Sequence, residues 1–390
     1  MINHDPLQFV SSLGAKLATR SRHVCALFGA GVGRSCGLPD VEGLRDQVLD
    51  GLDPEKRAAL ERQLVNHDLE GSLSRVRRIS ALISGNDTVD GLTSSQAEAL
   101  DKAVCQLIVE SLCAPAEDMD AMICLAAWAA RANYNLPLEL FTLNYDLLLE
   151  RAFEEMRVPY FDGFIGSLRA RFHTELVEAS PGTDIEMVPP FFVRLWKLHG
   201  SVNWVWNKNG EIVRLGDAVP KGLAAAIYPA DTKYEESRRV PFVVLQDRFR
   251  RALHQPETLM IIAGYSFSDD HINEQIFDAA TRRQRSEFIV FSYSDIPKTL
   301  AQRAEMTPNI QVVAAHEAII GGVRGNWKES DDAPSNIWRD DSFALPDFKY
   351  LARHLALSTS YEFLGDKHIR DLLAKAILGG SNELVEDTHD

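Results

Sequence analysis

Several short stretches of the chain carry residue types that suit work on a nucleotide. Gly29, Ala30 and Gly31 form a glycine-rich turn, which can bring backbone N–H groups close to a pyrophosphate. Asn144 offers a neutral amide that can orient a water molecule or a ribose hydroxyl. His199 offers an imidazole that can act as a general base near neutral pH. These types matter only if the fold brings them together.

Each stretch lies at the end of a predicted strand, and the strands alternate with helical segments. This alternation predicts a doubly wound α/β fold with a mostly parallel, Rossmann-like sheet. Most of the strands are continuously apolar, as is typical of strands covered by helices on both faces. Ligands of such sheets bind at the carboxyl ends of the strands, so we expect the stretches to converge. The predicted strands are residues 23–29, 139–144, 193–200, 224–229, 257–266, 287–293 and 310–315.

Each stretch also has a purely structural interpretation. The glycine turn can be a tight turn and nothing more, and a lone histidine is more often structural than catalytic. Asp146 can cap the helix predicted over residues 147–153. Residues 268–270 form an ordinary acidic helix start, and we favour this capping role over a metal site with His271.

The glycine turn does not fit a dehydrogenase. Arg34 stands where the motif G-x-G-x-x-G needs its third glycine. Residues 43–60 have helical periodicity, whereas a dehydrogenase needs a second strand ending in an acidic residue that binds the ribose. The sequence therefore disfavours a redox cofactor.

The length of the chain indicates a main domain with additions. We predict a catalytic domain over residues 1–330, followed by a helical C-terminal extension with an acidic tail. An exposed linker is expected at the junction, because residues 322–342 are polar and rich in turn formers. The remaining predicted parts are a helical insertion at about 43–135, a second insertion at about 160–190, the extension at 331–390 with helices at 346–357 and 366–378, and the acidic tail at 383–390.

Composition limits the class of protein. The net charge of −15, from 41 basic and 56 acidic residues, disfavours direct nucleic-acid binding. Five cysteines without a C-x-x-C pair argue against a disulfide framework and a four-cysteine zinc module, so we expect no metal. The N-terminus lacks a secretion pattern, and the most apolar run, 121–130, is too short to span a bilayer. We expect a cytoplasmic protein without a membrane partner.

Taken together, the motifs resemble the sirtuin family of NAD-consuming enzymes. The resemblance is closer still to bacterial sirtuin-like proteins of antiphage defence, and it covers about residues 20–320. Those proteins have runs similar to TLNYD at 142–146, KLHGSVNW at 197–204, YPADTK at 228–233 and GYSFSDDHIN at 264–273. The residues that match sirtuin motifs are Gly29, Ala30, Gly31, Gly37, Leu38, Pro39, Asp40, Thr142, Asn144, Asp146, His199, Gly200, Gly264 and Ser266.

The resemblance implies an NAD+ glycohydrolase that depletes NAD+ in abortive infection, with NAD+ as its substrate and not as a cofactor. It implies that Asn144 positions water and the ribose and that His199 is the base. Asp146 would orient the nicotinamide carboxamide or hold Asn144. Gly29, Ala30 and Gly31 are expected to cradle the pyrophosphate, and Gly264 and Ser266 the adenosine half. The other residues expected to bind NAD+ are Leu38, Pro39, Asp40 and Tyr265.

Departures from the sirtuin pattern favour water as the acceptor. The chain has no cysteine after Cys124, so the zinc module of protein deacylases is missing. Val41 and Glu42 replace the family's Phe-Arg, and Gly33 replaces its serine. Two alternatives stay open: a protein deacylase, and an NAD- or ADP-ribose-binding or DNA-processing subunit of an ATPase complex. The resemblance also implies a homo-oligomer regulated within a large complex, with a HerA-type ring ATPase as partner.

Overall fold

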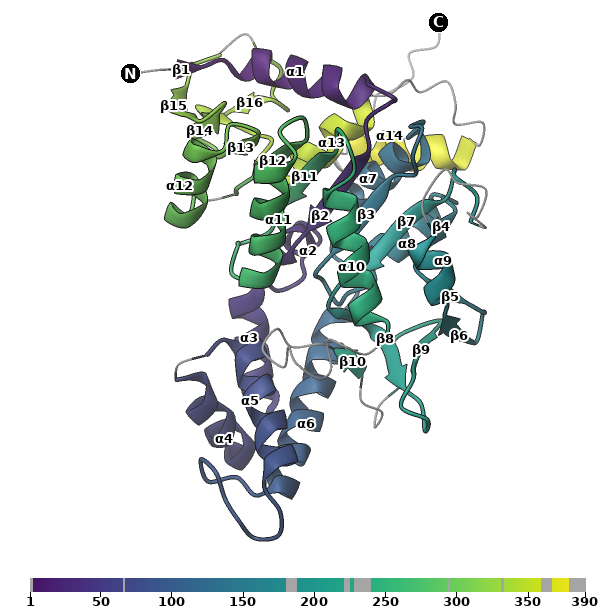
Figure 1. Cartoon of the computed structure of the whole chain (residues 1–390), viewed down its shortest axis with the longest axis vertical. Helices are drawn as coiled ribbons and strands as arrows, with labels where there is room; N and C mark the ends of the chain where they lie inside the picture. The colour runs from purple at the N-terminus through teal and green to yellow at the C-terminus, as the bar shows by residue number, and fades with distance from the viewer. Residues whose placement is uncertain are drawn as a thin grey trace, which may run out of the picture.

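A ten-stranded sheet forms the centre of the molecule (Figure 1). The computed structural model describes residues 3–65, 67–179, 188–220, 225–227, 240–293, 295–330, 333–358 and 367–378. The strand order is β1-β15-β14-β13-β12-β11-β2-β3-β7-β4, and the strands from β13 to β4 all pair in parallel. The predicted α/β class with a mostly parallel sheet is confirmed. The strands are β1 (Asn3–His4), β2 (Val24–Phe28), β3 (Glu139–Thr142), β4 (Tyr160–Phe161), β7 (Val193–Lys197), β11 (Leu259–Ala263), β12 (Glu287–Phe291), β13 (Ile310–Val313), β14 (Glu317–Ile320) and β15 (Val323–Trp327).

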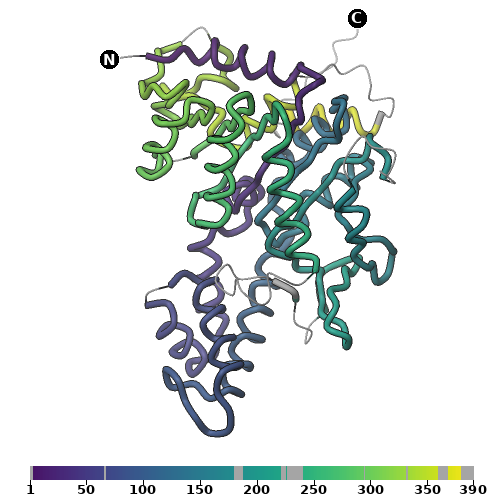
Figure 2. The backbone as a smooth tube through the Cα atoms, in the orientation of Figure 1, coloured from purple at the N-terminus to yellow at the C-terminus, as the bar shows by residue number. Residues whose placement is uncertain are grey.

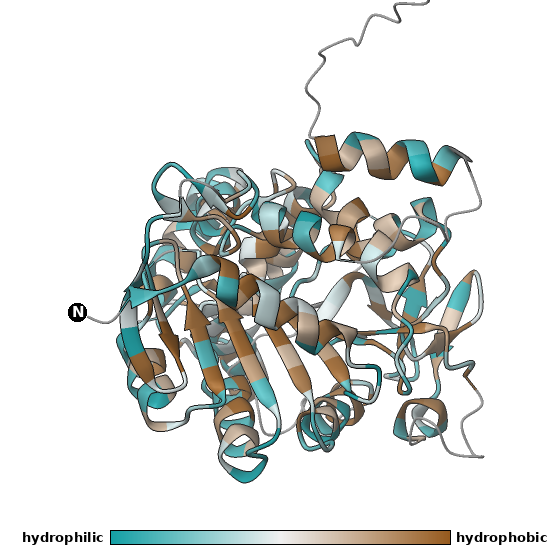
Figure 3. Ribbon diagram, turned by 90° about the horizontal axis from the view of Figure 1, so that it is seen from above, coloured by the Kyte–Doolittle hydropathy of each residue, from teal (hydrophilic) through white to brown (hydrophobic). Residues whose placement is uncertain are grey.

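The central strands are buried on both faces, which explains their continuous apolar sequence. In β2, Ala26 and Phe28 belong to one apolar cluster, whereas Cys25 and Leu27 belong to the other. This alternation follows from the two-residue period of a strand. Seen from above, the apolar sheet lies between helices (Figure 3). The first cluster includes α1 (Pro6–Ala18), α7 (Asp120–Ala130), α8 (Leu148–Glu155), α13 (Phe348–Leu357) and α14 (Lys367–Leu378), and the second includes α10 (Phe242–Leu253), α11 (Asp270–Arg282) and α12 (Lys298–Met306).

A helical body projects from the sheet layer after the short helix α2 (Ala30–Arg34) (Figure 2). It falls within the predicted insertion at 43–135. The last helix of that range, α7, lies elsewhere: it packs against α13 and α14 beside the sheet, and nine of its eleven residues are buried. Its uniformly apolar sequence fits this position between layers. The body consists of α3 (Val41–Gly51), α4 (Pro54–Leu64), α5 (Leu69–Leu82) and α6 (Ser94–Leu112).

A second, five-stranded sheet lies beside the main one and includes two strands, at 164–165 and 169–172, from the region predicted as the second insertion. The predicted strand at 193–200 ends at Lys197 in the main sheet, and the chain enters the second sheet at Gly200. Of the predicted strand at 224–229, residues 225–227 form β10 in this sheet, and the others lie outside the described residues. Its elements are β5 (Phe164–Ile165), β6 (Arg169–Phe172), β8 (Gly200–Trp206), β9 (Ile212–Leu215) and β10 (Ala225–Ile227), with α9 (Thr174–Glu178) nearby.

Most of the described residues in 322–342 are exposed or half-buried, as predicted, but the region is not an irregular linker because it contains paired strands. β15 pairs with β14 and β1, and β16 (Trp338–Arg339) forms a hairpin with β17 (Ser342–Phe343). Trp327 and Phe343 bury their rings against Phe9 of α1. This burial of aromatic surface holds the segment in place despite the polar residues around the two rings. The two predicted C-terminal helices are present as α13 and α14, whereas the tail at 383–390 lies outside the described residues. None of the described helices is long and apolar enough to cross a membrane.

Candidate active site

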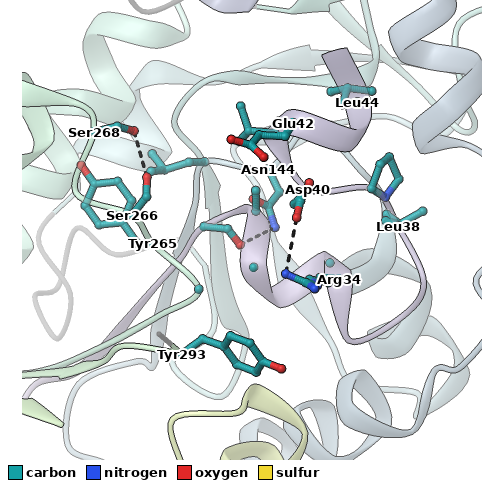
Figure 4. A pocket seen from close by; sticks show the side chains of 18 of the residues that line it. Arg34, Leu38, Asp40, Glu42, Leu44, Asn144, Tyr265, Ser266, Ser268 and Tyr293 are labelled. Atoms are coloured by element: carbon teal, nitrogen blue, oxygen red, sulfur yellow. Dashed lines mark hydrogen bonds and ion pairs between the residues drawn. The ribbon is translucent and has the colours of Figure 1, made fainter. Parts of the chain in front are cut away.

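A cavity of about 610 Å³ lies between the carboxyl ends of the main-sheet strands and the helical body (Figure 4). Its wall contains residues that follow β2, β3, β7 and β11, together with residues of α3 and α5. The structure brings all twelve residues predicted from the sequence to this one wall. They are Gly29, Ala30, Gly31, Leu38, Pro39, Asp40, Asn144, Asp146, His199, Gly264, Tyr265 and Ser266.

The glycine loop packs against the loop that follows β11. A Cβ atom on Gly29 would lie 2.5 Å from the Gly264 carbonyl oxygen, and Gly264 itself has a φ of +64°. The backbone N–H of Gly29 donates to Ala263 O at 3.1 Å, and that of Gly31 to Gly264 O at 2.9 Å. Close backbone contact thus explains why these positions are glycine. Two of the amides proposed to bind a pyrophosphate already donate within the protein.

The side chain of Asn144 is hydrogen-bonded to the glycine loop. Its Nδ2 donates to Gly29 O at 3.0 Å, and its backbone N–H donates to Thr142 Oγ1 at 3.0 Å. Because the amide nitrogen is used in this way, the orientation of the side chain is fixed. Its Oδ1 atom can then accept a hydrogen bond from water or a hydroxyl in the cavity.

Asp146 has a buried carboxyl group near the start of α8. Its Oδ1 accepts from the N–H of Leu148 at 3.0 Å, as a helix-start residue would. Burial raises the pKa of this carboxyl, and the nearby Lys197 charge opposes the shift. Lys197 donates to the backbone carbonyl of Asp146 and forms an ion pair with Glu150 at 3.0 Å. Asp146 therefore combines a local structural role with a place on the cavity wall.

His199 lies in the short connection between the two sheets and is paired with an acid from another strand end. Its Nε2 is 3.4 Å from Oδ2 of Asp269, and both side chains are largely buried. Oδ1 of Asp269 accepts from the N–H of His271, so Asp269 is also the N-cap of α11. The predicted capping role is confirmed. The same carboxylate additionally faces His199, where it can orient the imidazole and stabilise its charged form.

The β11–α11 loop is held by hydrogen bonds within itself. Tyr265 donates its hydroxyl to Asn273 Oδ1 at 2.8 Å, and Asn273 Nδ2 donates to Phe267 O at 2.8 Å. Phe267 has a positive φ of 59°, which is uncommon for an aromatic residue and is supported by these bonds. Ser266 and Ser268 share a hydroxyl contact of 2.9 Å at the cavity (Figure 4). The loop thus presents its hydroxyl groups from a fixed backbone.

The cavity wall is strongly acidic. Seven carboxylate residues line it, whereas Arg34 is the one arginine or lysine among the described lining residues. Such a lining favours a ligand group that carries or develops positive charge. The acidic lining residues are Asp40, Glu42, Asp68, Glu70, Asp146, Asp269 and Asp347.

A buried group with metal-ligand chemistry lies at the opposite, amino ends of the strands. Ligand atoms of His23, Cys25 and Glu139 lie within 4.8 Å of one another. Both carboxylate oxygens of Glu139 already accept from Arg248, at 2.6 and 2.7 Å, and one also accepts from Trp196. Because Arg248 balances the charge of Glu139, we interpret these two residues as a structural ion pair and assign no metal to the group.

Comparison with known proteins agrees with the motifs in the cavity. Residues 138–313 match the family model described as the SIR2-like domain. This part of the chain is similar to that family. The match includes Asn144 and His199 and begins after the glycine loop. Among solved structures, a mutant Sir2 homologue in complex with ADP-ribose is similar at 16% identity, covering 93% of this chain and 97% of its own, with a TM-score of 0.43. No curated protein matches the chain.

Among the wall residues that were not predicted as site residues, Arg34, Glu70 and Asp269 have polar contacts that bear on the site. Asp269 lies within the stretch that matches the SIR2-like model. Its sequence context indicated only a helix cap, so its contact with His199 was not predicted. Glu70 comes from the helical body, and it accepts from the Tyr145 hydroxyl at 2.5 Å. Burial raises the pKa of Glu70, and the His199 charge and the Tyr145 bond oppose this shift. No local sequence signal links Glu70 to a site, because the contact depends on how the body packs.

Proposed function

We propose that the protein is an NAD+ glycohydrolase, which hydrolyses the nicotinamide–ribose bond to give nicotinamide and ADP-ribose. The observation that carries this proposal is the presence of Asn144 and His199 on one cavity wall, beside an acidic lining. The SIR2-like match over the same residues supports a sirtuin-like function that uses NAD.

In the proposed reaction, the C1′–N bond breaks and its electron pair leaves with nicotinamide. Positive charge develops on the ribose, as in other glycosyl transfers. The cavity carboxylates favour this charge electrostatically. Asn144, fixed by its bond to Gly29, would accept a hydrogen bond from the attacking water or a ribose hydroxyl. Water oxygen then bonds to C1′, and its proton passes to His199, which Asp269 stabilises when charged.

The test is release of nicotinamide from NAD+ by the purified full chain, followed by chromatography. Asn144→Ala and His199→Ala should each lower the rate by at least about 100-fold, the usual size of a general-base contribution. His173→Ala is a matched control, because His173 pairs with Glu175 outside the cavity wall. Undiminished activity in both cavity variants would refute the assigned roles.

We also propose a setting for this activity: NAD+ depletion in antiphage defence by a regulated homo-oligomer with a ring-ATPase partner. The motif resemblance supports this setting. Light scattering should show a mass well above that of one chain. Cellular NAD+ should fall during phage infection in cells that carry the protein and persist in cells that carry the His199→Ala variant. A stable monomer would contradict the oligomer, and unchanged NAD+ would contradict the defence role.

A further inference from the structure

Arg34 is exceptional in the charge pattern of the cavity. The seven lining carboxylates suit the cationic half of NAD+ but repel its pyrophosphate. Any dinucleotide that enters must therefore find a local positive charge for its phosphates. Among the described lining residues, only Arg34 offers a permanent one.

The guanidinium of Arg34 is available for a ligand. Its side chain is 62% exposed, and its Nη1 lies 3.4 Å from Asp40 Oδ2, a long ion pair. Its Cζ lies 5.7 Å from the centre of the Tyr293 ring, which also lines the cavity (Figure 4). A guanidinium has five N–H donors in a planar fork that matches phosphate oxygens. One long ion pair with a surface carboxylate leaves most of this capacity unused.

Asp40 can give up Arg34 without losing its structural role. Its Oδ1 accepts from the N–H of Gly43 at 2.9 Å and caps α3, whereas its Oδ2 faces Arg34. The two functions use different oxygens. A phosphate can therefore replace Oδ2 as the partner of Arg34 while the helix cap stays in place.

Several backbone N–H groups of the glycine loop are already used in hydrogen bonds within the protein. The N–H groups of Gly29, Gly31 and Val32 donate to carbonyls of the protein at 2.9–3.1 Å. Three amides of the turn are thus unavailable for a pyrophosphate. Arg34 lies at the end of the same short helix and carries the charge that these amides cannot supply.

We infer that Arg34 binds the pyrophosphate of the dinucleotide, exchanging Asp40 for phosphate oxygens, and so selects dinucleotides over ligands without phosphate. This inference deepens the proposed function and rests on it for the identity of the ligand. If this exchange occurs, substitution of Arg34 and substitution of Asp40 should change phosphate binding in opposite directions. Loss of Arg34 weakens binding of the phosphates, whereas loss of the Asp40 charge strengthens it.

The experiment measures binding of ADP-ribose and adenosine to the full chain by calorimetry, and turnover of NAD+ and nicotinamide riboside. Arg34→Met should weaken ADP-ribose binding by about 10- to 100-fold, the range of a charge-assisted hydrogen bond, and leave adenosine unchanged. The same variant should raise KM for NAD+ by a similar factor, with kcat within about threefold. Nicotinamide riboside, which lacks the pyrophosphate, should be turned over at the wild-type rate.

Asp40→Asn keeps a side chain that can cap α3 and should tighten ADP-ribose binding severalfold. Glu42→Gln removes another cavity carboxylate nearby and serves as the control for a general charge effect. In the Arg34→Met background, Asp40→Asn should no longer tighten ADP-ribose binding. The inference would be overturned if Asp40→Asn and Glu42→Gln tightened ADP-ribose binding equally. It would also be overturned if Arg34→Met weakened the binding of ADP-ribose and of adenosine by the same factor.

The two proposals can fail separately. Wild-type protein that binds ADP-ribose through Arg34 but never releases nicotinamide refutes the hydrolase and keeps the phosphate role. Turnover of NAD+ that Arg34→Met does not impair refutes the phosphate role and keeps the hydrolase. Wild-type protein that binds neither NAD+ nor ADP-ribose refutes both.

Discussion

Nε2 of His199 lies 3.4 Å from Oδ2 of Asp269, although the two residues follow different strands of the sheet. Asp269 also caps α11 through its other oxygen, so the helix fixes the carboxylate that faces the imidazole. This arrangement gives His199 a partner for the proton that it would accept. It also makes the start of α11 part of the proposed catalytic machinery.

Asp269→Asn tests this pairing. Asparagine can still cap α11, but it cannot stabilise a charged imidazole, so we expect nicotinamide release to fall by about 100-fold with little change in stability. The rate and the thermal unfolding temperature are measured together. Asp270→Asn is the control, because this neighbouring acid is exposed in the first turn of the same helix. Equal rates for the two variants would remove Asp269 from the mechanism.

Tyr145→Phe tests the link between the helical body and the strand ends. The change removes the hydroxyl donor that lies 2.5 Å from Glu70 Oε1 and leaves a half-buried carboxylate without this hydrogen bond. The free energy of unfolding should fall by about 1–3 kcal/mol, measured by urea denaturation. Tyr350→Phe makes the same chemical change at an exposed bond to Arg339 and should have a smaller effect. A wild-type stability of Tyr145→Phe would contradict the importance of this contact.

Gly29→Ala tests the close contact between the two loops of the site. The new Cβ would meet Gly264 O at 2.5 Å and Tyr265 Cα at 2.7 Å, so the loops must separate. We expect a loss of about 1–3 kcal/mol of stability and a large loss of activity. Gly14→Ala is the control: its Cβ meets nothing within 4 Å in α1, and it should stabilise the protein by about 1 kcal/mol. Normal activity of Gly29→Ala would refute the tight packing.

Glu139→Gln tests the buried ion pair at the other end of the sheet. Burial alone would raise the pKa of Glu139, but Arg248 and His23 hold it well below the ordinary value of 4.5. Because the folded-state pKa is lowered, the ion pair stabilises the protein above about pH 4.5. The contribution is lost as the pH falls through the folded-state pKa. At pH 7 the variant should lose about 3–5 kcal/mol, measured by urea unfolding.

The difference between Glu139→Gln and wild type should narrow as the pH is lowered from 5 towards 3. Glu98→Gln is the control, because this exposed acid pairs with Lys102 on the surface of α6 and should have little effect at any pH. A difference between Glu139→Gln and wild type that stays constant with pH would show that the carboxylate charge of Glu139 does not stabilise the fold.

Local patterns were enough to predict the sheet class and most of its strands. The continuous apolar runs around Cys25 and Ile261 required burial on both faces, whatever the strand order. The strands within 322–342 were not predicted, because Trp327 and the adjoining Phe343 pack against Phe9 of α1, far away in the sequence. The position of α7 beside the sheet was missed for the same reason.

The sequence by itself determined the parallel α/β class and placed Asn144 and His199 at strand ends, because burial and turn chemistry act over short stretches. Tertiary structure alone decided what surrounds them. It put Asp269 against His199, Glu70 against Tyr145, and Arg34 as the one arginine or lysine beside seven carboxylates in the described cavity wall. These relationships depend on the order of strands and the docking of the helical body. Contacts between distant segments set both, and no local pattern records them.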